Sequence, residues 1–249
     1  MRLKNLLSGF LTFLTLLFGV SCSNDDGDSE TPDGSGRVNI TAKATYSGST
    51  SRSSFARNEN VVLTQFLVNI EEIEFEIDDD LWDNDDDDAW DDDGYYDFDD
   101  DIELVGPFEL DLLSGEVTLT NVIIPNGVYE EIEFEFDYSE NASSELYEKT
   151  ILIKGTIDGV PFEFWHRFEE EVEVDFEDSE ENIVVNDNNN TIVITFDLNM
   201  VLNDIDLSAA VDGNADGLIE ISPNDEDGNN ALANSLKNKI KEYTDLLDD

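Results

Sequence analysis

Residues Glu131-Ile132-Glu133-Phe134-Glu135-Phe136-Asp137-Tyr138 alternate between acidic and apolar side chains. Successive side chains of a β-strand point to opposite faces of the sheet. As a strand, this segment would place isoleucine, phenylalanine and tyrosine on one face and four carboxylates on the other. The sequence therefore predicts a strand with one face in a core and an acidic outer face.

The same alternation recurs on either side of this segment. Three further segments have it: Ile73–Ile77, Phe108–Leu112 and Val172–Phe176. Between Ile70 and Ile73 the apolar parity slips by one residue, which a bulge or strand break at Glu71-Glu72 would repair. Several half-buried strands in one chain favour a sandwich of two packed sheets.

Turn sequences separate these predicted strands. Pro125-Asn126-Gly127 precedes Val128, and Asp158-Gly159 is typical of a tight hairpin. A polar loop at Asn186 to Asn190 precedes a strand from Thr191 to Leu198. We expect an all-β fold, an antiparallel β-sandwich over residues 37–228.

Helical spacing is confined to the C-terminus, residues 229–249. The apolar residues that recur there every three or four positions are Leu232, Leu236, Ile240, Tyr243 and Leu247. We expect an amphipathic helix with Asn229 or Asn230 as its N-cap. Lys237, Lys239 and Lys241 would dock this helix onto the acidic sheet.

The N-terminus has the layout of a bacterial lipoprotein signal. Arg2 and Lys4 precede an apolar run that ends at Ser21-Cys22, and this run is shorter than the ~20 residues that a transmembrane helix needs. Residues 1–21 resemble a lipoprotein signal peptide, and Cys22, the single cysteine of the chain, would carry the lipid. Residues 22–36 would form an acidic, flexible tether.

Charge restricts the partners of this chain. Its 62 acidic and 12 basic residues give a formal net charge of −50. A polyanion is repelled by phosphate backbones, so nucleic acid is excluded as a partner. A hydrophobic content of 39 % indicates a folded domain despite this charge, and glutamates facing one another across strands should require salt or divalent cations for stability.

Three strings resemble a group of Bacteroidota lipoprotein domains of unknown function: residues 107–115 (PFELDLLSG), residues 126–132 (NGVYEEI) and residues 158–162 (DGVPF). The resemblance implies a transthyretin-like β-sandwich. The acidic residues just after Cys22 resemble the export tag of such lipoproteins. That tag implies an outer-membrane protein, lipid-anchored and facing the cell exterior.

A calcium-like loop spans residues 212–227. Asp212, Asn214 and Asp216 stand at positions 1, 3 and 5, Gly217 at position 6 and the apolar Ile219 at position 8, as in an EF-hand-like loop. Position 12 is Pro223 instead of an acid, so closure would fall to Glu220, Asp225 or Asp227. The alternative is a plain Asp/Asn/Gly turn. The expected metal ligands are Asp212, Asn214, Asp216, Leu218, Glu220 and Asp225, with Ca²⁺ as the ion.

An Asp-rich insertion occupies residues 78–101, between two predicted strands. It contains aromatic residues that would contact a glycan or a surface protein, namely Trp82, Trp90, Tyr95 and Tyr96. The alternative is a solvated acidic loop.

We therefore expect a calcium-binding or cation-stabilised surface module without catalytic activity. His166 is the single histidine, so no histidine pair for a zinc site is available, and we interpret it as a strand residue. The competing hypothesis is a metal-dependent hydrolase that uses the Asp-rich insertion.

Overall fold

The structure is a computed structural model that describes residues 34–48, 58–77, 101–175, 183–186 and 189–248. All of these belong to one compact unit, residues 31–249. The predicted signal peptide and Cys22 lie outside the described residues. So do the aromatic residues predicted to contact a ligand, Trp82, Trp90, Tyr95 and Tyr96.

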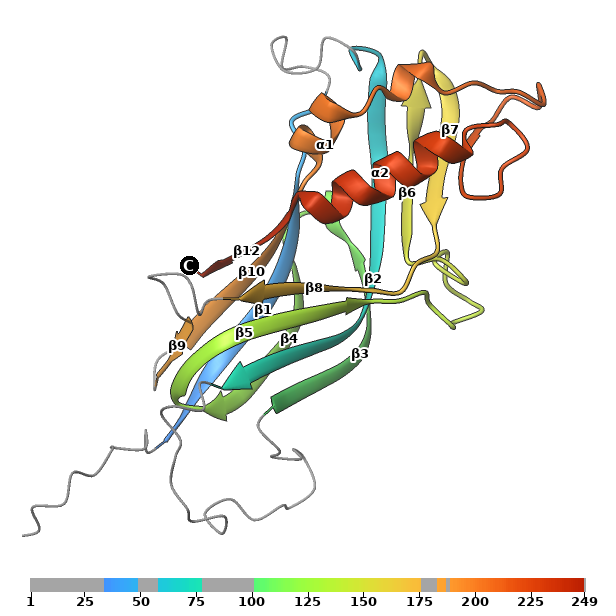
Figure 1. The fold of residues 1–249 in the computed structure, drawn as a ribbon. Coiled ribbons are helices and arrows are strands. Elements are labelled where there is room, and N and C mark those ends of the chain that lie inside the picture. The colour runs from blue at the N-terminus through green and yellow to red at the C-terminus, as the bar shows by residue number, and fades with distance from the viewer. Residues whose placement is uncertain (1–33, 49–57, 78–100, 176–182, 187–188, 249) are drawn as a thin grey trace, which may run out of the picture. The chain divides into compact units, whose positions relative to one another are not determined.

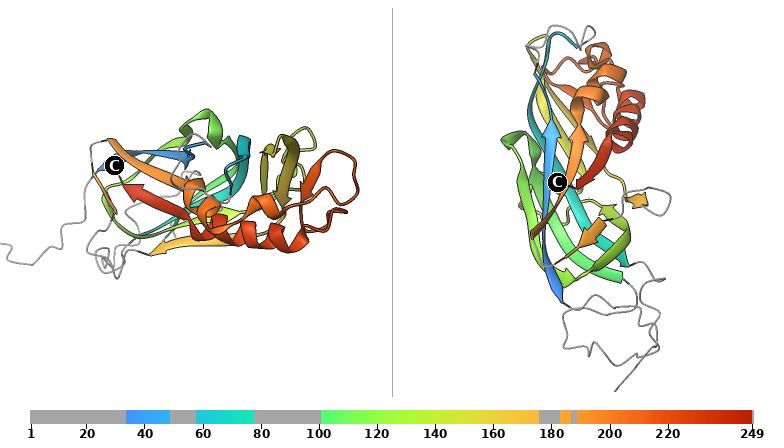
Figure 2. Two further views of the ribbon diagram at one scale, coloured as in Figure 1. Left: turned by 90° about the horizontal axis from the view of Figure 1, so that it is seen from above. Right: turned by 90° about the vertical axis from the view of Figure 1, so that its left-hand side faces the viewer.

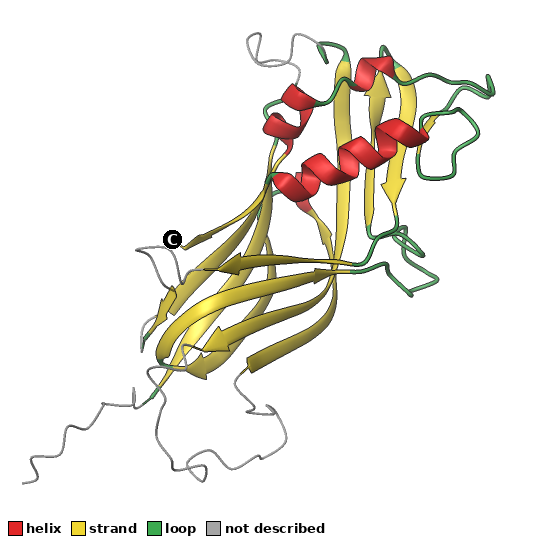
Figure 3. Cartoon of the chain, viewed as in Figure 1, coloured by secondary structure: helices red, strands yellow, loops and turns green. Residues whose placement is uncertain are grey.

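Two β-sheets make up most of the described chain (Figures 1 and 3). The first sheet contains, in spatial order, β12 (Thr244–Asp248), β10 (Asn189–Asp197), β1 (Ser35–Thr45) and β4 (Val117–Pro125). The path of the second is β11 (Ile219–Ile221), β7 (Val160–His166), β6 (Ile151–Ile157), β2 (Val61–Ile77), β5 (Gly127–Phe136) and β8 (Glu170–Asp175). Two more strands join it: β3 (Asp101–Asp111) pairs with β2, and β9 (Ile183–Val185) pairs with β5.

The apolar faces of the two sheets share one core. Phe196 of β10 makes edge-on ring contacts with Phe66 of β2 and Phe136 of β5, at centroid distances of 5.5 and 6.1 Å. These rings are at most 5 % exposed. The expected all-β sandwich is confirmed. Most strand pairs are antiparallel, while β1 with β10 and β7 with β11 are parallel.

Strand β2 connects the two halves of the second sheet. Its N-terminal half pairs with β6 and its C-terminal half with β5. Against β3 the register shifts between Ile70 and Glu72, which confirms the expected bulge. Gly106 of β3 lies against this irregularity, because a Cβ on it would stand 2.7 Å from the carbonyl oxygen of Glu71.

The expected turns are also present. Asp158 and Gly159, with φ of 51° and 82°, join β6 to β7 in a two-residue hairpin. Asn126 separates β4 from β5 and so carries the chain from one sheet to the other. The buried Tyr129 hydroxyl donates a hydrogen bond to the Pro125 carbonyl oxygen at 2.9 Å and holds this crossing.

Helix α2 (Asn230–Glu242) is the expected C-terminal helix, and it buries Ala233, Leu236 and Ile240. Its predicted extension to residue 249 is wrong. Residues 244–248 form β12, which pairs antiparallel with β10 from Thr244 to Asp248. The open edge of β10 offers backbone hydrogen bonds that outweigh the local helical spacing.

Three shorter features complete the chain. Helix α1 (Leu198–Asp204) follows β10 directly, and its N-cap Asp197 accepts hydrogen bonds from the amides of Asn199 and Met200. Single 3₁₀ turns lie at Leu112–Ser114 and Leu207–Ala209. Both α-helices lie on the same side of the strands (Figure 2). Among the described residues, no helix has the length and apolarity that crossing a membrane requires.

The domain begins slightly earlier than expected. Strand β1 starts at Ser35, so the last two residues of the predicted tether pair with β4. Gly36 fits this position because a Cβ there would lie 2.2 Å from the Asn186 carbonyl oxygen.

Candidate functional site

The acidic outer face of the second sheet is assembled from four neighbouring strands. Glu74 of β2 stands opposite Glu103 of β3 on one side and Glu133 of β5 on the other. Glu133 in turn stands opposite Glu173 of β8. The neighbouring row places Glu72, Glu135 and Glu171 in register. We call these seven residues, together with Glu76 and Glu131, the carboxylate face.

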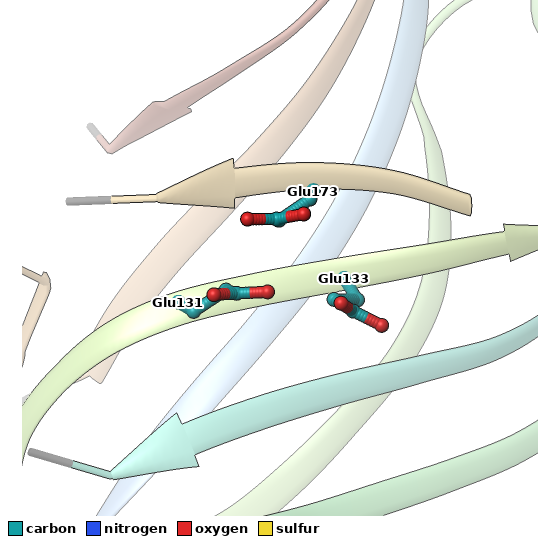
Figure 4. Close-up of side chains that lie close together, drawn as sticks. All are labelled: Glu131, Glu133 and Glu173. Atoms are coloured by element: carbon teal, nitrogen blue, oxygen red, sulfur yellow. The ribbon is translucent and has the colours of Figure 1, made fainter.

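Three members of the carboxylate face form a tight cluster. Glu131 and Glu133 on β5 and Glu173 on β8 each contribute a carboxylate oxygen, and these oxygens lie within 4.8 Å of one another (Figure 4). Glu131 and Glu133 are half-buried, whereas Glu173 is exposed. Among the described histidines, cysteines and acidic residues, this is the group of three that lies close enough to hold a metal ion.

Ionisation of this cluster is unfavourable in the folded protein. Burial, a hydrogen bond with Glu133 and the nearby charge of Glu173 raise the pKa of Glu131 to about 8. Burial also raises the pKa of Glu72, with the charge of Glu103 adding to it, and that of Glu135, with the charge of Glu72 adding to it. A raised carboxyl pKa means that the folded protein opposes ionisation at these positions.

The ion pairs of the described residues lie outside this cluster. None of the described ion pairs includes Glu131, Glu133 or Glu173; they are Lys149–Glu163, Lys154–Glu145, Lys237–Glu170, Lys239–Asp204, Lys239–Glu242 and Lys241–Glu170. Hard oxygen ligands of this type are those that Ca²⁺ prefers. The arrangement can therefore accept a divalent cation in place of a protein counter-charge.

Helix α2 docks on the sheet at the start of β8. Lys237 and Lys241 both pair with Glu170 at the start of β8, Lys241 at 3.0 Å, as the sequence predicts. Lys239 instead reaches Asp204 at the end of α1, at 3.0 Å. These contacts lower the pKa of Asp204 through hydrogen bonds from Tyr243 and Lys239.

The predicted calcium loop is held together by its own carboxylates. Asp212 accepts hydrogen bonds from the amides of Asp216 and Gly217 at 3.1 and 2.9 Å. Asn214 accepts from Asp216, and Asp216 accepts from Leu218, both at 2.9 Å. Hydrogen bonds of the same kind also occur in a plain Asp/Asn/Gly turn, so they do not distinguish it from a calcium loop. The calcium assignment for this loop stays a prediction.

The two remaining acids predicted as ligands in this loop lie in different elements. Glu220 belongs to β11 and stands opposite Glu163 of β7; burial and the charge of Asp227 raise its pKa. Asp225 accepts from the amides of Ser222, Gly228 and Asn229. In the described chain, these acids do not join Asp212 and Asp216 in a group of three with oxygens within 4.8 Å.

Sequence reasoning found the acidic faces but missed the cluster. The alternation marks Glu131 and Glu133 on one strand and Glu173 on another. The register that brings them together depends on the pairing of β5 with β8, which residues 137–169 separate in the chain. His166 ends β7, so its interpretation as a strand residue is confirmed.

Comparison with known proteins finds a weak likeness to a solved structure. No family model matches the chain, and no curated protein matches it. MbnP from Methylosinus trichosporium superposes with a TM-score of 0.39 and 12 % sequence identity, over 86 % of this chain and 98 % of that one. A likeness at this level assigns neither a family nor a function.

Proposed function

We propose that this protein is a lipid-anchored, non-catalytic binding module of the cell surface whose carboxylate face is stabilised by divalent cations, calcium foremost. One observation carries the proposal: Glu131, Glu133 and Glu173 meet across β5 and β8 without a basic partner among the described residues. Two ionised carboxylates ~5 Å apart repel by roughly 1 to 3 kcal/mol. Total domain stability is only ~5 to 15 kcal/mol, so a few such pairs need a counter-ion.

Anchoring rests on the sequence. A charged N-terminal segment, a short apolar run and a single cysteine at position 22 support lipidation, and the acids that follow support export to the outer face. Two or more acyl chains make anchoring stable. On the same basis we propose a relationship to the transthyretin-like lipoprotein domains. Cys22→Ser should abolish incorporation of labelled palmitate and release the protein from the membrane fraction; unchanged incorporation would refute the anchor.

The cation proposal is tested by thermal unfolding of the full chain in EDTA and in millimolar calcium or magnesium. We expect calcium to raise the melting temperature of the native protein. The triple variant Glu131→Gln, Glu133→Gln, Glu173→Gln should melt higher than the native protein in EDTA and should lose most of the response to calcium. Amides remove the repulsion while they keep the size of each side chain.

A matched control removes the same number of charges at exposed positions elsewhere in the chain. Glu59→Gln, Glu116→Gln, Glu140→Gln alters three acids outside the carboxylate face. This control should keep the calcium response. Equal responses in the two triple variants would mean that calcium acts through net charge alone, and a native melting temperature that does not respond to calcium would refute the proposal.

A further inference from the structure

A hollow of about 630 Å³ lies at the end of β7, on a part of the molecule separate from the cluster of Glu131, Glu133 and Glu173. Ligand pockets typically measure about 300–1,000 Å³ and combine aromatic walls with a few polar groups. The residues that line this hollow include Tyr138, Trp165, Phe168, Glu148, Arg167 and Asn224.

Three aromatic rings from two stretches of chain form its walls. Trp165 is half-buried at the end of β7, and Phe168 follows three residues later. Tyr138 lies just beyond β5, and the Arg167 guanidinium is stacked over its ring, 3.4 Å from the centroid. A guanidinium that stacks on an aromatic ring keeps its N–H groups available as hydrogen-bond donors.

The rim of the hollow is held in place before any ligand arrives. Glu148 has a φ of 58°, in the left-handed region, and its amide donates to the Ser139 carbonyl oxygen at 2.8 Å. Glu109 accepts hydrogen bonds from the hydroxyls of Ser139 and Ser144 and so clamps this loop. A rim that is already ordered reduces the entropy cost of binding.

The end of β7 and the residues just after it are also held by hydrogen bonds. Thr150 accepts from the Phe168 amide at 3.0 Å and donates to the Phe168 carbonyl oxygen at 2.6 Å. His166 is 8 % exposed, and its two ring nitrogens already pair with the Arg167 carbonyl oxygen and the Asn234 side chain. His166 therefore forms part of the floor, and the exposed polar groups of the rim are left to meet a ligand.

We propose that this hollow binds a neutral saccharide. The inference rests on the proposed surface-binding function and gives it a ligand class. The rim offers two carboxylates, Glu148 and Glu169, a guanidinium and the amide of Asn224. A sugar hydroxyl both donates and accepts hydrogen bonds, so it matches all three kinds of group. The apolar C–H face of a sugar ring packs against an aromatic ring such as Trp165.

Charged ligands fit this hollow less well. A polyanion meets a chain of net charge −50 and the two rim carboxylates. An organic cation would be attracted by those carboxylates, but Arg167 and Lys149 already lie over the Tyr138 and Trp165 rings and would repel it. A neutral polyhydroxyl compound avoids both conflicts, and its binding should be insensitive to salt.

The test is calorimetric titration of the full chain with neutral hexasaccharides, namely cellohexaose, maltohexaose, mannohexaose and xylohexaose. Polygalacturonate and chitosan serve as anionic and cationic comparators. We expect at least one neutral probe to bind with equal affinity at low and high salt. Trp165→Ala should weaken that binding about tenfold or more, as the loss of a central aromatic contact does, and Trp165→Phe should weaken it less.

Two further variants make the result decisive. Arg167→Met removes the exposed donors together with the guanidinium over Tyr138 and keeps an unbranched side chain, so it should weaken binding even if Trp165→Ala fails to fold. Trp82→Ala with Trp90→Ala tests the rival prediction that the tryptophans of the Asp-rich insertion contact the glycan. The proposal is overturned if no neutral probe binds, if only a charged comparator binds, or if the loss follows Trp82 and Trp90 instead of Trp165.

Failure of this inference is separable from failure of the proposed function. The calcium-dependent rise in melting temperature is measured on the same samples. If that rise persists while no saccharide binds, the proposed saccharide site is refuted and the proposal of a cation-stabilised module stands. If a saccharide binds without a calcium response, the cation proposal fails and the saccharide site stands.

Discussion

At the scale of single residues, Asp227 organises the chain between the 3₁₀ turn at Leu207–Ala209 and α2. It is 6 % exposed, and its carboxylate accepts hydrogen bonds from the amides of Gly213, Asn214 and Glu220 at 3.0, 3.1 and 2.7 Å. Gly213 is required for this approach, since a Cβ there would lie 2.4 Å from the Asp227 carbonyl oxygen. A buried carboxylate is tolerated when backbone donors surround it in this way.

Removing the Asp227 carboxylate should lower the free energy of unfolding more than removing that of Glu226. Asp227→Ala leaves three amides without their acceptor and should lower the free energy of unfolding by about 3 kcal/mol, measured by urea denaturation. Asp227→Asn keeps one acceptor oxygen and should lose less. Glu226→Ala, at an exposed position one residue away, is the control. Equal losses for Glu226→Ala and Asp227→Ala would contradict the role given to Asp227.

At the scale of elements, the sequence predicts what depends on local periodicity. Alternation is a property of a single strand, so the strands around Ile132, Ile73 and Val172 are all found where the pattern places them. The slip of parity before Ile73 marks the bulge in β2 for the same reason. Asp158-Gly159 specifies its hairpin because Gly159 readily adopts a positive φ.

Features that depend on distant partners were not predictable in this way. Residues 244–248 have the spacing of a helix, yet they pair with β10 because that strand has an open edge. The parallel pairing of β1 with β10 joins Arg37 to Asn189, far apart in sequence, and no local signal encodes it. The same limit hides the cluster, since alternation gives the face of each glutamate and not the register between strands.

At the scale of the whole molecule, charge is distributed unevenly over the fold. Lys237, Lys239 and Lys241 fasten the helix to Glu170 and Asp204, so the cations of that region are used in docking. Burial opposes ionisation of Glu170, but hydrogen bonds from Lys237 and Lys241 and their charges outweigh it and lower the pKa of Glu170. The carboxylate face has the opposite character, because burial and like charges raise the pKa of Glu72, Glu131 and Glu135.

These opposed shifts predict how stability depends on pH. Where the folded pKa is raised, the folded state binds more protons than the unfolded state, so the free energy of unfolding falls as pH increases. For Glu131 this interval runs from the ordinary value of 4.5 to about 8. The lowered pKa values of Glu145, Glu170 and Asp204 act below that interval, where their stabilisation is lost as pH falls.

In EDTA, the native protein should therefore melt at a higher temperature near about pH 5 than near about pH 8. Calcium should reduce this slope, because a bound cation favours the ionised carboxylates that protons otherwise neutralise. Glu131→Gln should reduce it as well, since an amide does not titrate, whereas Glu140→Gln, at an exposed position outside the carboxylate face, should not. Melting curves across this pH range decide the matter: a protein more stable at pH 8 than at pH 5 in EDTA would mean that the carboxylates are neutralised by groups of the chain itself.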